Sequence, residues 1–195
     1  GERLNMETPL WKLMNEALAK NNTFMLTAGG GVYEPEYIWS SNNKITSLAE
    51  LKGKRVRVVG FEAEEILKSY GAAGARIASS ELYLAVQRGA VDATTANLGT
   101  VMGRKLHEQV KYCYKLPITA YSVAIFFLKD FWDKQPDKVK AAFWEAAKIY
   151  EQNASPVVNK KFFPEVYWPR IEKAGIKIIS PTANEMKDVR EKSQP

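Results

Sequence analysis

The stretch Arg55-Val-Arg-Val-Val59 alternates charged and β-branched residues, and Gly60 follows it directly. This alternation is typical of a β-strand, and glycine commonly ends one. The next residues, Glu62 to Tyr70, have the composition of a helix that stops at Gly71. These residues therefore predict one strand followed by one helix.

The same order of elements repeats downstream. We expect Ala75–Ala78 to be a short strand, Ser80–Arg88 a helix that stops at Gly89, and Ala90–Thr95 another strand. Strands that alternate with helices are typical of a parallel sheet. The chain is thus predicted to be an α/β protein.

Further elements are expected before and after this repeat. They are a helix over Leu10–Leu18, a buried strand over Thr23–Ala28, a helical turn that Ser47-Leu-Ala-Glu50 caps, a long strand over Ala120–Leu128, a long helix that begins at Pro136, a second helical stretch to about Lys173, a strand over Ile176–Ile179, and a last helix that Thr182-Ala-Asn-Glu185 caps. The apolar run Val123–Leu128 has the length of a buried strand.

The composition is that of a folded globular protein. Of 195 residues, 46% are hydrophobic and 26% are charged, which excludes a disordered or fibrous chain. The net charge of +6 is a mild excess that suits an anionic ligand. Nucleic-acid-binding proteins usually concentrate their positive charge in stripes, so no nucleic-acid partner is expected. No apolar run approaches the roughly 18 to 20 residues of a membrane-spanning helix, so no direct membrane insertion is expected either.

The sequence offers few residues for catalysis. No G-x-S-x-G motif occurs, His107 is the only imidazole and Cys113 the only thiol. A single cysteine excludes an internal disulfide and a zinc site built from thiolates. We expect His107 on a solvated helix surface and Cys113 in the core. No catalytic residue, metal ion or cofactor is predicted.

Two other motifs have ordinary interpretations. Gly29-Gly-Gly31 resembles a phosphate loop, but neither the lysine nor the helix start of such loops follows, so a turn after a strand is expected. Glu62, Glu64 and Glu65 are close enough in sequence for a metal cluster. In the first turn of a helix, however, they complement the helix dipole, and we prefer this role.

Arg57 stands out because it lies in a strand that otherwise reads as buried, two residues before its end. The carboxyl ends of parallel strands open onto the ligand crevice of an α/β sheet. A buried guanidinium needs an anionic partner, and its planar donors match a carboxylate in a bidentate pair. From the residues alone, an internal salt bridge and a ligand carboxylate are both open.

Four ordered blocks of the sequence are similar to one protein family. Ser47-Leu-Ala-Glu-Leu-Lys-Gly-Lys-Arg-Val-Arg-Val58 resembles S-x-x-D-L-K-G-x-K-I-R-V, and Tyr70-Gly-Ala-Ala-Gly-Ala-Arg-Ile77 resembles L-G-A-x-P-V-x-M. Ser80-Glu-Leu-Tyr-Leu-Ala-Val-Gln87 and Gly89-Ala-Val-Asp92 resemble S-E-V-Y-x-A-L-Q-x-G-x-V-D-G, but the sequence then departs from the family, because the glycine and the glutamate of V-D-G-x-E-x are absent from Val91-Asp-Ala-Thr-Thr-Ala96. These patterns belong to the TRAP-transporter solute-binding proteins of the DctP type.

The resemblance implies a periplasmic-binding-protein type II-like fold, with the second lobe and the returning segments of an incomplete first lobe. Residues 1–22 would be the end of the first lobe and the crossover helix. Residues 23–118 would form the second α/β lobe with the strand that binds the carboxylate. Residues 119–195 would hold a return strand, a long helix and C-terminal segments that bridge the lobes.

The resemblance also implies a ligand site. Arg57 occupies the position of the family's carboxylate-binding arginine, and Tyr37 falls near a second ligand-binding arginine of some members. Ser79 stands where an aromatic residue often packs on the ligand, and Asn97 lies one place past the usual polar contact. Tyr37 and Trp39 alternate along an extended segment, so both could face a pocket or both could simply pack.

The function that the resemblance implies is that of a periplasmic receptor. It would bind a small organic acid and deliver it to the membrane subunits of a sodium-coupled TRAP transporter, without covalent chemistry. A full-length precursor would then carry a signal peptide, whereas residues 1–16 lack that pattern. A ligand-sensing module of a signalling protein is the alternative, and an enzyme is the third possibility.

Overall fold

The computed structural model describes residues 5–29 and 32–193. The chain forms two compact units, each built from two segments. Unit 1 comprises Gly1–Tyr33 and Tyr121–Pro164, and unit 2 comprises Glu34–Ala120 and Glu165–Pro195. The sequence had assigned residues from 23 onwards to the second lobe and residues 119–195 to a bridging segment. In the structure, residues 23–33 belong with unit 1, and residues 165–195 belong with unit 2.

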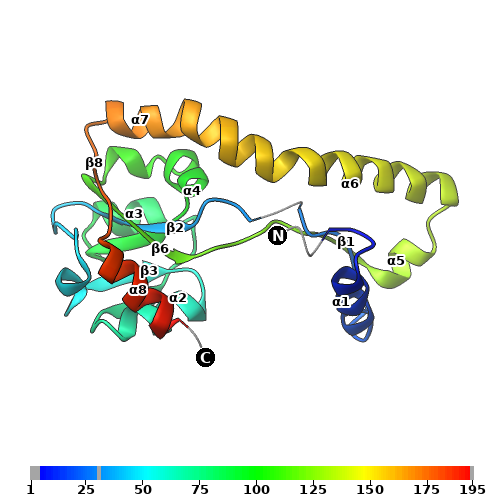
Figure 1. Cartoon of the computed structure of the whole chain (residues 1–195), viewed down its shortest axis with the longest axis horizontal. Helices are drawn as coiled ribbons and strands as arrows, with labels where there is room; N and C mark the ends of the chain where they lie inside the picture. Colours follow the sequence, from blue (N-terminus) through cyan, green and yellow to red (C-terminus); the bar gives the residue numbers. More distant parts are fainter. Residues whose placement is uncertain (1–4, 30–31, 194–195) are drawn as a thin grey trace. The chain divides into compact units, whose positions relative to one another are not determined.

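Unit 2 is built on a six-stranded sheet (Figure 1). Its spatial order is β4 (Ala73–Arg76), β3 (Arg55–Val58), β5 (Ala93–Ala96), β2 (Glu36–Ser40), β6 (Tyr112–Thr119) and β8 (Lys177–Ile179). The parallel pairing predicted for the repeat is confirmed, since β3 runs parallel to both β4 and β5. The sheet also contains β2, which lies outside that repeat and runs antiparallel to β5 and β6.

One face of this sheet carries the main apolar core. Val56 and Val58 point into it from β3, and Ile38 points into it from β2. Helix α2 (Phe61–Lys68) adds Ala63 and Leu67, and helix α8 (Ala183–Lys192) adds Val189. This core explains why Val56 and Val58 alternate with arginines along β3.

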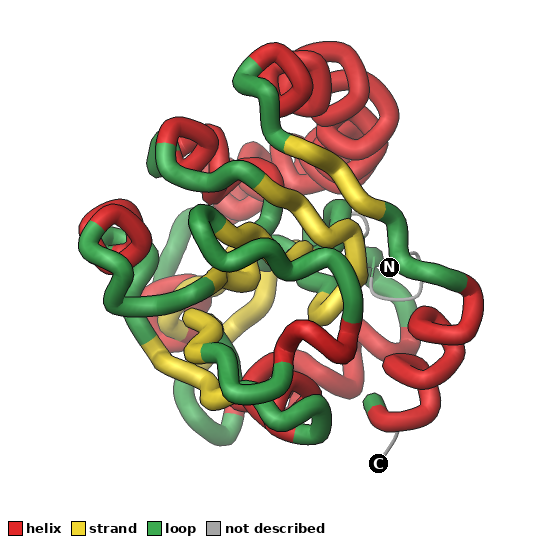
Figure 2. Tube along the Cα trace, turned by 90° about the vertical axis from the view of Figure 1, so that its left-hand side faces the viewer, coloured by secondary structure: helices red, strands yellow, loops and turns green. Residues whose placement is uncertain are grey.

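The opposite face is covered by other helices. Figure 1 shows α3 (Leu82–Gln87), α4 (Leu98–Gly103) and α7 (Trp168–Lys173) on the side of the sheet away from α2 and α8. Figure 2, seen from the side of unit 2, shows the strands between these groups of helices. The sheet therefore has helices on both faces, as an α/β unit requires.

The last helix is capped as predicted. Thr182 and Glu185 form a capping box at the start of α8, and Glu185 also accepts a hydrogen bond from the Leu48 N–H at 3.0 Å. This bond ties α8 to the short helix η2 (Leu48–Leu51). The second predicted cap is wrong, because the Ser47 side chain makes no capping bond. Glu50 instead accepts hydrogen bonds from the N–H and the hydroxyl of Thr46.

Unit 1 contains α1 (Pro9–Ala19) and a two-stranded antiparallel sheet of β1 (Thr23–Thr27) and β7 (Ile125–Leu128). Its core is aromatic: Trp11 packs edge-on against Phe24 and Trp144, and Phe24 stacks on Trp132 at 4.8 Å. Gly29 ends β1 with φ +83°, and a side chain there would collide with the carbonyl oxygen of Val123. The rest of the predicted glycine turn, residues 30–31, lies outside the described residues.

Helices complete the chain after β7. They are α5 (Lys129–Asp133), α6 (Asp137–Val157), the π-helical stretch η4 (Val158–Tyr167), α7 and, after β8, α8. The short η3 (Leu106–Glu108) lies earlier, between α4 and β6. Pro136 caps α6 rather than starting it, and Pro156 and Pro164 lie within the long helical stretch. No helix in the described part of the chain is long and apolar enough to cross a membrane.

The predicted strand over Ala120–Leu128 is only partly correct. The long strand in this region is β6, which ends at Thr119, and only Ile125–Leu128 form β7. The prediction that this apolar run is buried is wrong, because Phe126 is 51% and Leu128 63% exposed. A run of apolar residues indicates a strand, but it does not say on which side of the strand other chain segments lie.

The first prediction concerns Glu185. Burial alone would raise its pKa, but hydrogen bonds from the N–H groups of Thr182 and Leu48 outweigh burial and lower the pKa from 4.5 to about 2. A lowered pKa stabilises the fold above pH 4.5, and this contribution is lost as the pH falls toward 2. Glu185→Gln should therefore lower the free energy of unfolding by about 1–3 kcal/mol at neutral pH.

Urea unfolding of Glu185→Gln, followed by circular dichroism at pH values from 7 down to about 2, measures this effect. The difference from wild type should shrink as the pH falls below 4.5. Glu191→Gln is the matched control, because Glu191 lies on the same helix and only approaches exposed Lys187 at 3.8 Å. A difference that is independent of pH, or equal in both variants, would contradict the prediction.

The second prediction concerns the exposed strand β7. Exposed apolar residues that lie close together promote association, so the 195-residue chain should self-associate in sedimentation velocity experiments. Phe126→Ser combined with Leu128→Ser should shift the distribution toward monomer. Leu84→Ser, at a site in unit 2 that is 48% exposed, should not. A wild-type chain that stays monomeric at about 100 μM would contradict this prediction.

Candidate functional site

The sheet of unit 2 sets Arg57 and Trp39 on the same face. Arg57 pairs with Thr94 across β3 and β5, and Thr94 pairs with Trp39 across β5 and β2. Residues directly opposite each other in neighbouring strands point to the same side of a sheet. Val56 and Val58 point to the other side, into the apolar core. The predicted site residues of β2 and β3 therefore lie opposite the main core.

The Arg57 guanidinium is held by three hydrogen bonds. Its Nε donates to the Ile77 carbonyl at 2.8 Å, Nη1 to the Thr95 carbonyl at 3.2 Å, and Nη2 to the Ser79 hydroxyl at 3.0 Å. Ile77 and Ser79 follow β4, and Thr95 is near the end of β5. The guanidinium thus lies at the carboxyl ends of neighbouring parallel strands, where α/β sheets bind ligands.

All three acceptors around Arg57 are neutral. The side chain is only 1% exposed, and no carboxylate within the described residues forms an ion pair with it. Burial lowers the pKa of Arg57, and the negative charge of Glu36 partly opposes this shift. A guanidinium has five N–H donors, and three are engaged here, so one N–H on each Nη is left. A buried charge of this kind is costly unless another group pairs with it.

Ser79 belongs to this site by direct contact, although the sequence placed it there only through a resemblance. Its hydroxyl holds Nη2, and the Thr95 hydroxyl donates to the Arg57 carbonyl at 3.4 Å. The bonds from the guanidinium to Ile77, Thr95 and Ser79 fix its plane. A fixed plane is the condition for a bidentate pair with a carboxylate.

Asn97 follows directly after β5 and caps α4. Its side-chain oxygen accepts a hydrogen bond from the Thr100 N–H at 2.8 Å. Asn97 therefore lies at the same end of the sheet as the Arg57 guanidinium, but its oxygen is engaged in capping. Its amide nitrogen is the part that a ligand could contact.

Tyr37 and Trp39 are packed in the structure. Trp39 is fully buried, its indole N–H donates to the Ala96 carbonyl at 2.9 Å, and its ring stacks on Trp168 of α7 at 6.2 Å. Tyr37 is 5% exposed and lies 5.9 Å from the same Trp168 ring. The sequence left two roles open for these rings, facing a pocket or packing. In the structure both rings pack.

Trp168 was not identified from the sequence, and it organises this face of unit 2. Its indole N–H donates to Glu34 at 3.1 Å, and the Lys115 ammonium lies 4.2 Å from its ring. The Tyr37 hydroxyl also donates to Glu34, at 2.9 Å. Burial, and then the neighbouring Glu34 charge, raise the pKa of Tyr37. Trp168 and Glu34 are 134 positions apart in the sequence, so no local pattern predicts their contact.

Other predicted residues have structural roles. Cys113 is fully buried, as predicted, and burial raises the pKa of its thiol. Glu64 lies in the first turn of α2, as predicted, and pairs with Arg76 at 2.7 Å. Within residues 5–29 and 32–193, no group of three or more His, Cys, Asp or Glu side chains could hold a metal ion.

Comparisons with known proteins match this architecture. The model of the DctP family, bacterial extracellular solute-binding protein family 7, matches residues 6–195. The fold is similar to an extracytoplasmic solute receptor of Bordetella pertussis that binds pyroglutamic acid, with TM-score 0.82 and 21% identity over 94% of this chain and 59% of that one.

Two TRAP periplasmic solute-binding proteins are also similar. One from Rhodoferax ferrireducens with bound malonate has TM-score 0.78 and 19% identity over 95% of this chain and 58% of that one. One from Desulfovibrio salexigens with bound orotic acid has TM-score 0.77 and 20% identity over 96% and 59%. The chain thus spans less than two thirds of the length of these structures.

The prediction from this site concerns Trp39. Because Trp39 is fully buried and stacked on Trp168, Trp39→Ala should lower the free energy of unfolding by about 3–5 kcal/mol. Tyr37→Phe keeps the ring and loses only the bond to Glu34, so about 1 kcal/mol is expected. Chemical unfolding followed by circular dichroism measures both values. If Trp39→Ala unfolds within about 1 kcal/mol of wild type, the ring is not a packing residue.

Proposed function

Because this chain belongs to the DctP family of bacterial extracellular solute-binding proteins, family 7, we propose that it binds a small organic acid through the carboxylate. The family acts outside the cytoplasm, in the periplasm. Proteins of this family are receptors rather than enzymes. Binding is accordingly the activity that the site has to perform.

The observation that carries the proposal is the buried Arg57 charge, which has three neutral acceptors and two unused N–H groups. The two unused donors are on different Nη atoms, so they can approach the two oxygens of one carboxylate. A charge-assisted pair of this kind is stronger than neutral hydrogen bonds. The ligand would supply the ion-pair partner that none of the described carboxylates provides.

The ligands of similar structures support the same chemistry. Pyroglutamic acid, orotic acid and malonate, which three of these proteins bind, all carry a carboxylate. L-Malate and β-D-galacturonate, in two further similar structures, do as well. The carboxylate is the feature these five ligands share, and it is the feature that Arg57 can recognise.

The other predicted site residues would act around this anchor. Ser79 would orient the guanidinium, and the Asn97 amide would contact the body of the ligand. Tyr37 and Trp39 would support the site from within the packed face rather than touch the ligand. Their contacts with Trp168 keep β2 in place beside β5, which carries Thr95.

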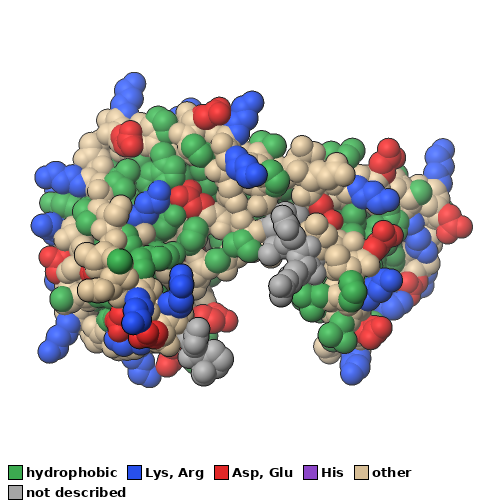
Figure 3. Space-filling view, viewed as in Figure 1, with side chains coloured by type: hydrophobic (Ala, Val, Ile, Leu, Met, Phe, Trp, Pro, Cys, Tyr) green, Lys and Arg blue, Asp and Glu red, His purple; other side chains and the backbone are tan. Residues whose placement is uncertain are grey.

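We extend the proposal to delivery. A receptor of the TRAP type would hand the bound acid to the membrane subunits of a secondary transporter. On the face seen in Figure 3, lysines and arginines are scattered and do not form a stripe, which favours a small anionic ligand over a nucleic acid. This step can be tested by measuring whether the ligand-loaded receptor binds transporter subunits that have been reconstituted in vesicles.

The decisive test is binding by Arg57 variants in the full-length receptor. Malonate, L-malate, orotate, pyroglutamate and D-galacturonate are first screened by thermal shift, and the tightest acid is used for calorimetry. Removing one partner of a buried charge pair costs about 2–5 kcal/mol. Arg57→Ala should therefore weaken binding by roughly thirtyfold or more.

Two controls make this test specific. Arg57→Lys keeps the charge but loses the planar donors, so it should also bind poorly. Arg55→Ala removes an exposed arginine of the same strand and should leave the affinity within about twofold. The amide of the acid should bind wild type about as weakly as the acid binds Arg57→Ala. If folded Arg57→Ala binds the acid within about threefold of wild type, the assignment of Arg57 is wrong.

A further inference from the structure

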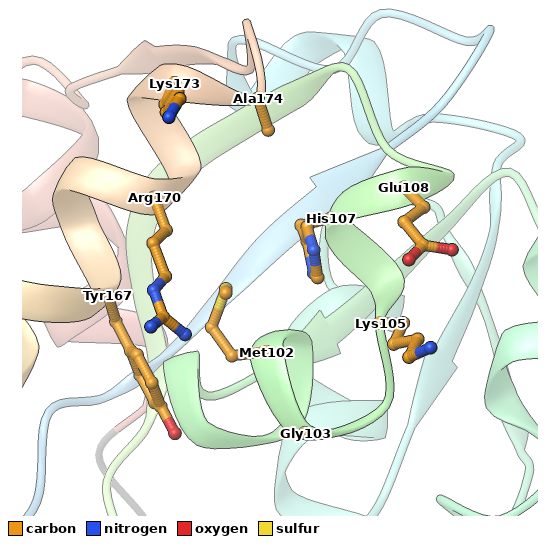
Figure 4. Close-up of a pocket in the computed structure, with 9 residues that line it drawn as sticks. All are labelled: Met102, Gly103, Lys105, His107, Glu108, Tyr167, Arg170, Lys173 and Ala174. Carbon is orange, nitrogen blue, oxygen red and sulfur yellow. The ribbon is translucent and has the colours of Figure 1, made fainter.

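Unit 2 has a cavity whose lining does not include Arg57 or the residues that bind its guanidinium. It has a volume of about 490 Å³ and lies between the segment of α4 and η3 on one side and α7 on the other (Figure 4). Its lining includes Met102, Lys105, His107, Glu108, Tyr167, Arg170 and Lys173, so one carboxylate and three basic side chains border it. None of these residues contacts Arg57 in the hydrogen-bond network described above. The cavity is therefore a separate site.

Positive charge dominates the α7 side of this cavity. Arg170 and Lys173 both line it, and neither forms an ion pair with a carboxylate of the described residues. Figure 4 shows the Arg170 side chain extended from α7 with its guanidinium toward Met102 and Tyr167. An arginine that is extended over a cavity without a carboxylate partner favours an anionic guest.

His107 lies on the opposite side of the cavity, on η3. The sequence predicted a solvated position for it, but its Nδ1 is buried and has no hydrogen-bond partner among the described residues. A buried polar atom without a partner is costly. Nδ1 is closed to solvent, so of the two ring nitrogens Nε2 is the one that could donate to an anionic oxygen in the cavity.

The backbone before His107 is unusual as well. Lys105 precedes η3 with φ 56° and ψ 24°, a left-handed conformation that is uncommon for a residue other than glycine or asparagine. This turn reverses the chain after α4. In Figure 4, His107 points into the cavity, and the ends of Lys105 and Glu108 lie on the far side of the turn. The Glu108 carboxylate accepts a hydrogen bond from the Tyr83 hydroxyl at 3.3 Å, so the negative charge is turned away from Arg170.

The remaining lining suits an organic body attached to the charged group. The Tyr167 ring and the Met102 side chain flank the space between Arg170 and His107 (Figure 4). A volume of about 490 Å³ is within the range of small-molecule sites and exceeds what an inorganic ion needs. Aromatic and thioether groups give such a body apolar contacts.

We propose that this cavity binds a small organic phosphate. The doubly charged head lies between Arg170 and the His107 imidazole, with Lys173 adding to the positive field, and the body of the ligand packs on Tyr167 and Met102. The site is independent of the carboxylate site at Arg57, so its failure would leave the proposed receptor function untouched.

The test uses the only histidine of the chain as a reporter. In protein without a histidine tag, the imidazole proton and carbon resonances come from His107 alone. Phenyl phosphate, inorganic phosphate and benzoate are titrated separately at constant pH and ionic strength. Phenyl phosphate should shift the His107 signals with saturation, and more tightly than inorganic phosphate because only it has a body. Benzoate, which carries one charge, should bind the site more weakly than phenyl phosphate.

Paired variants locate the binding. Arg170→Ala with Lys173→Ala removes two cations three residues apart on α7, and it should raise the dissociation constant of phenyl phosphate by about fivefold or more. Lys187→Ala with Arg190→Ala removes two cations with the same spacing on α8 and should change it by less than about twofold. Near-ultraviolet circular dichroism checks that each variant is folded, and the single Lys173→Gln serves if the double variant is not.

Three results would overturn the proposal. The first is no saturable shift of the His107 signals with phenyl phosphate up to about 20 mM. The second is an equal loss of affinity in the α7 and α8 variants, which would indicate attraction by net charge alone. The third is benzoate binding as tightly as phenyl phosphate, which would assign the cavity to monoanions. The Arg57 variants should leave the titration unchanged, which keeps this test distinct from that of the receptor function.

Discussion

The positive charge of Arg57 is buried at the ends of the central strands and has only neutral acceptors around it. Much of unit 2 serves to hold this charge in place. The carbonyl of Thr95 requires β5 beside β3, and Ile77 and Ser79 require the chain to turn directly after β4. The three bonds compensate part of the cost of burial, and a ligand carboxylate would compensate the rest.

The layers of unit 2 follow from the two faces of β3. Val56 and Val58 enter the apolar core under α2 and α8, and Arg57 between them points to the opposite face. That face is closed by the contacts of Trp168 with Tyr37 and Trp39. An alternation that the sequence shows over only five residues thus separates the face with the apolar core from the face that carries the proposed ligand site.

How much could be predicted depends on the range of the interactions. The strand of Arg57, the helix after it and the capping box at Thr182 were correctly predicted, because each rests on residues within one turn or one strand. Strand β2 was not recognised as antiparallel, and β6 was missed. All five residues of β2 are buried, so no alternation marks its faces. Trp168 could not be found either, since Glu34, which accepts its indole hydrogen bond, is 134 residues away along the chain.

The residues of the candidate site also differ in how far the sequence alone could predict them. The chemistry of Arg57 was visible in the sequence, because a charge inside an apolar strand needs an explanation. Ser79 and Asn97 came only from a resemblance, and the structure adds the Ser79 contact and the capping role of Asn97. The cavity at His107 had no counterpart in the sequence, since it depends on a left-handed turn at Lys105 and on the approach of α7.

A crystal structure of the full-length receptor with the tightest-binding organic acid would examine the role of Arg57 most directly. We expect one carboxylate with its two oxygens within about 3 Å of Nη1 and Nη2 of Arg57, while the bonds to Ile77, Thr95 and Ser79 persist. A bound acid whose carboxylate lies elsewhere, with Arg57 paired to a carboxylate of the protein itself, would contradict this role.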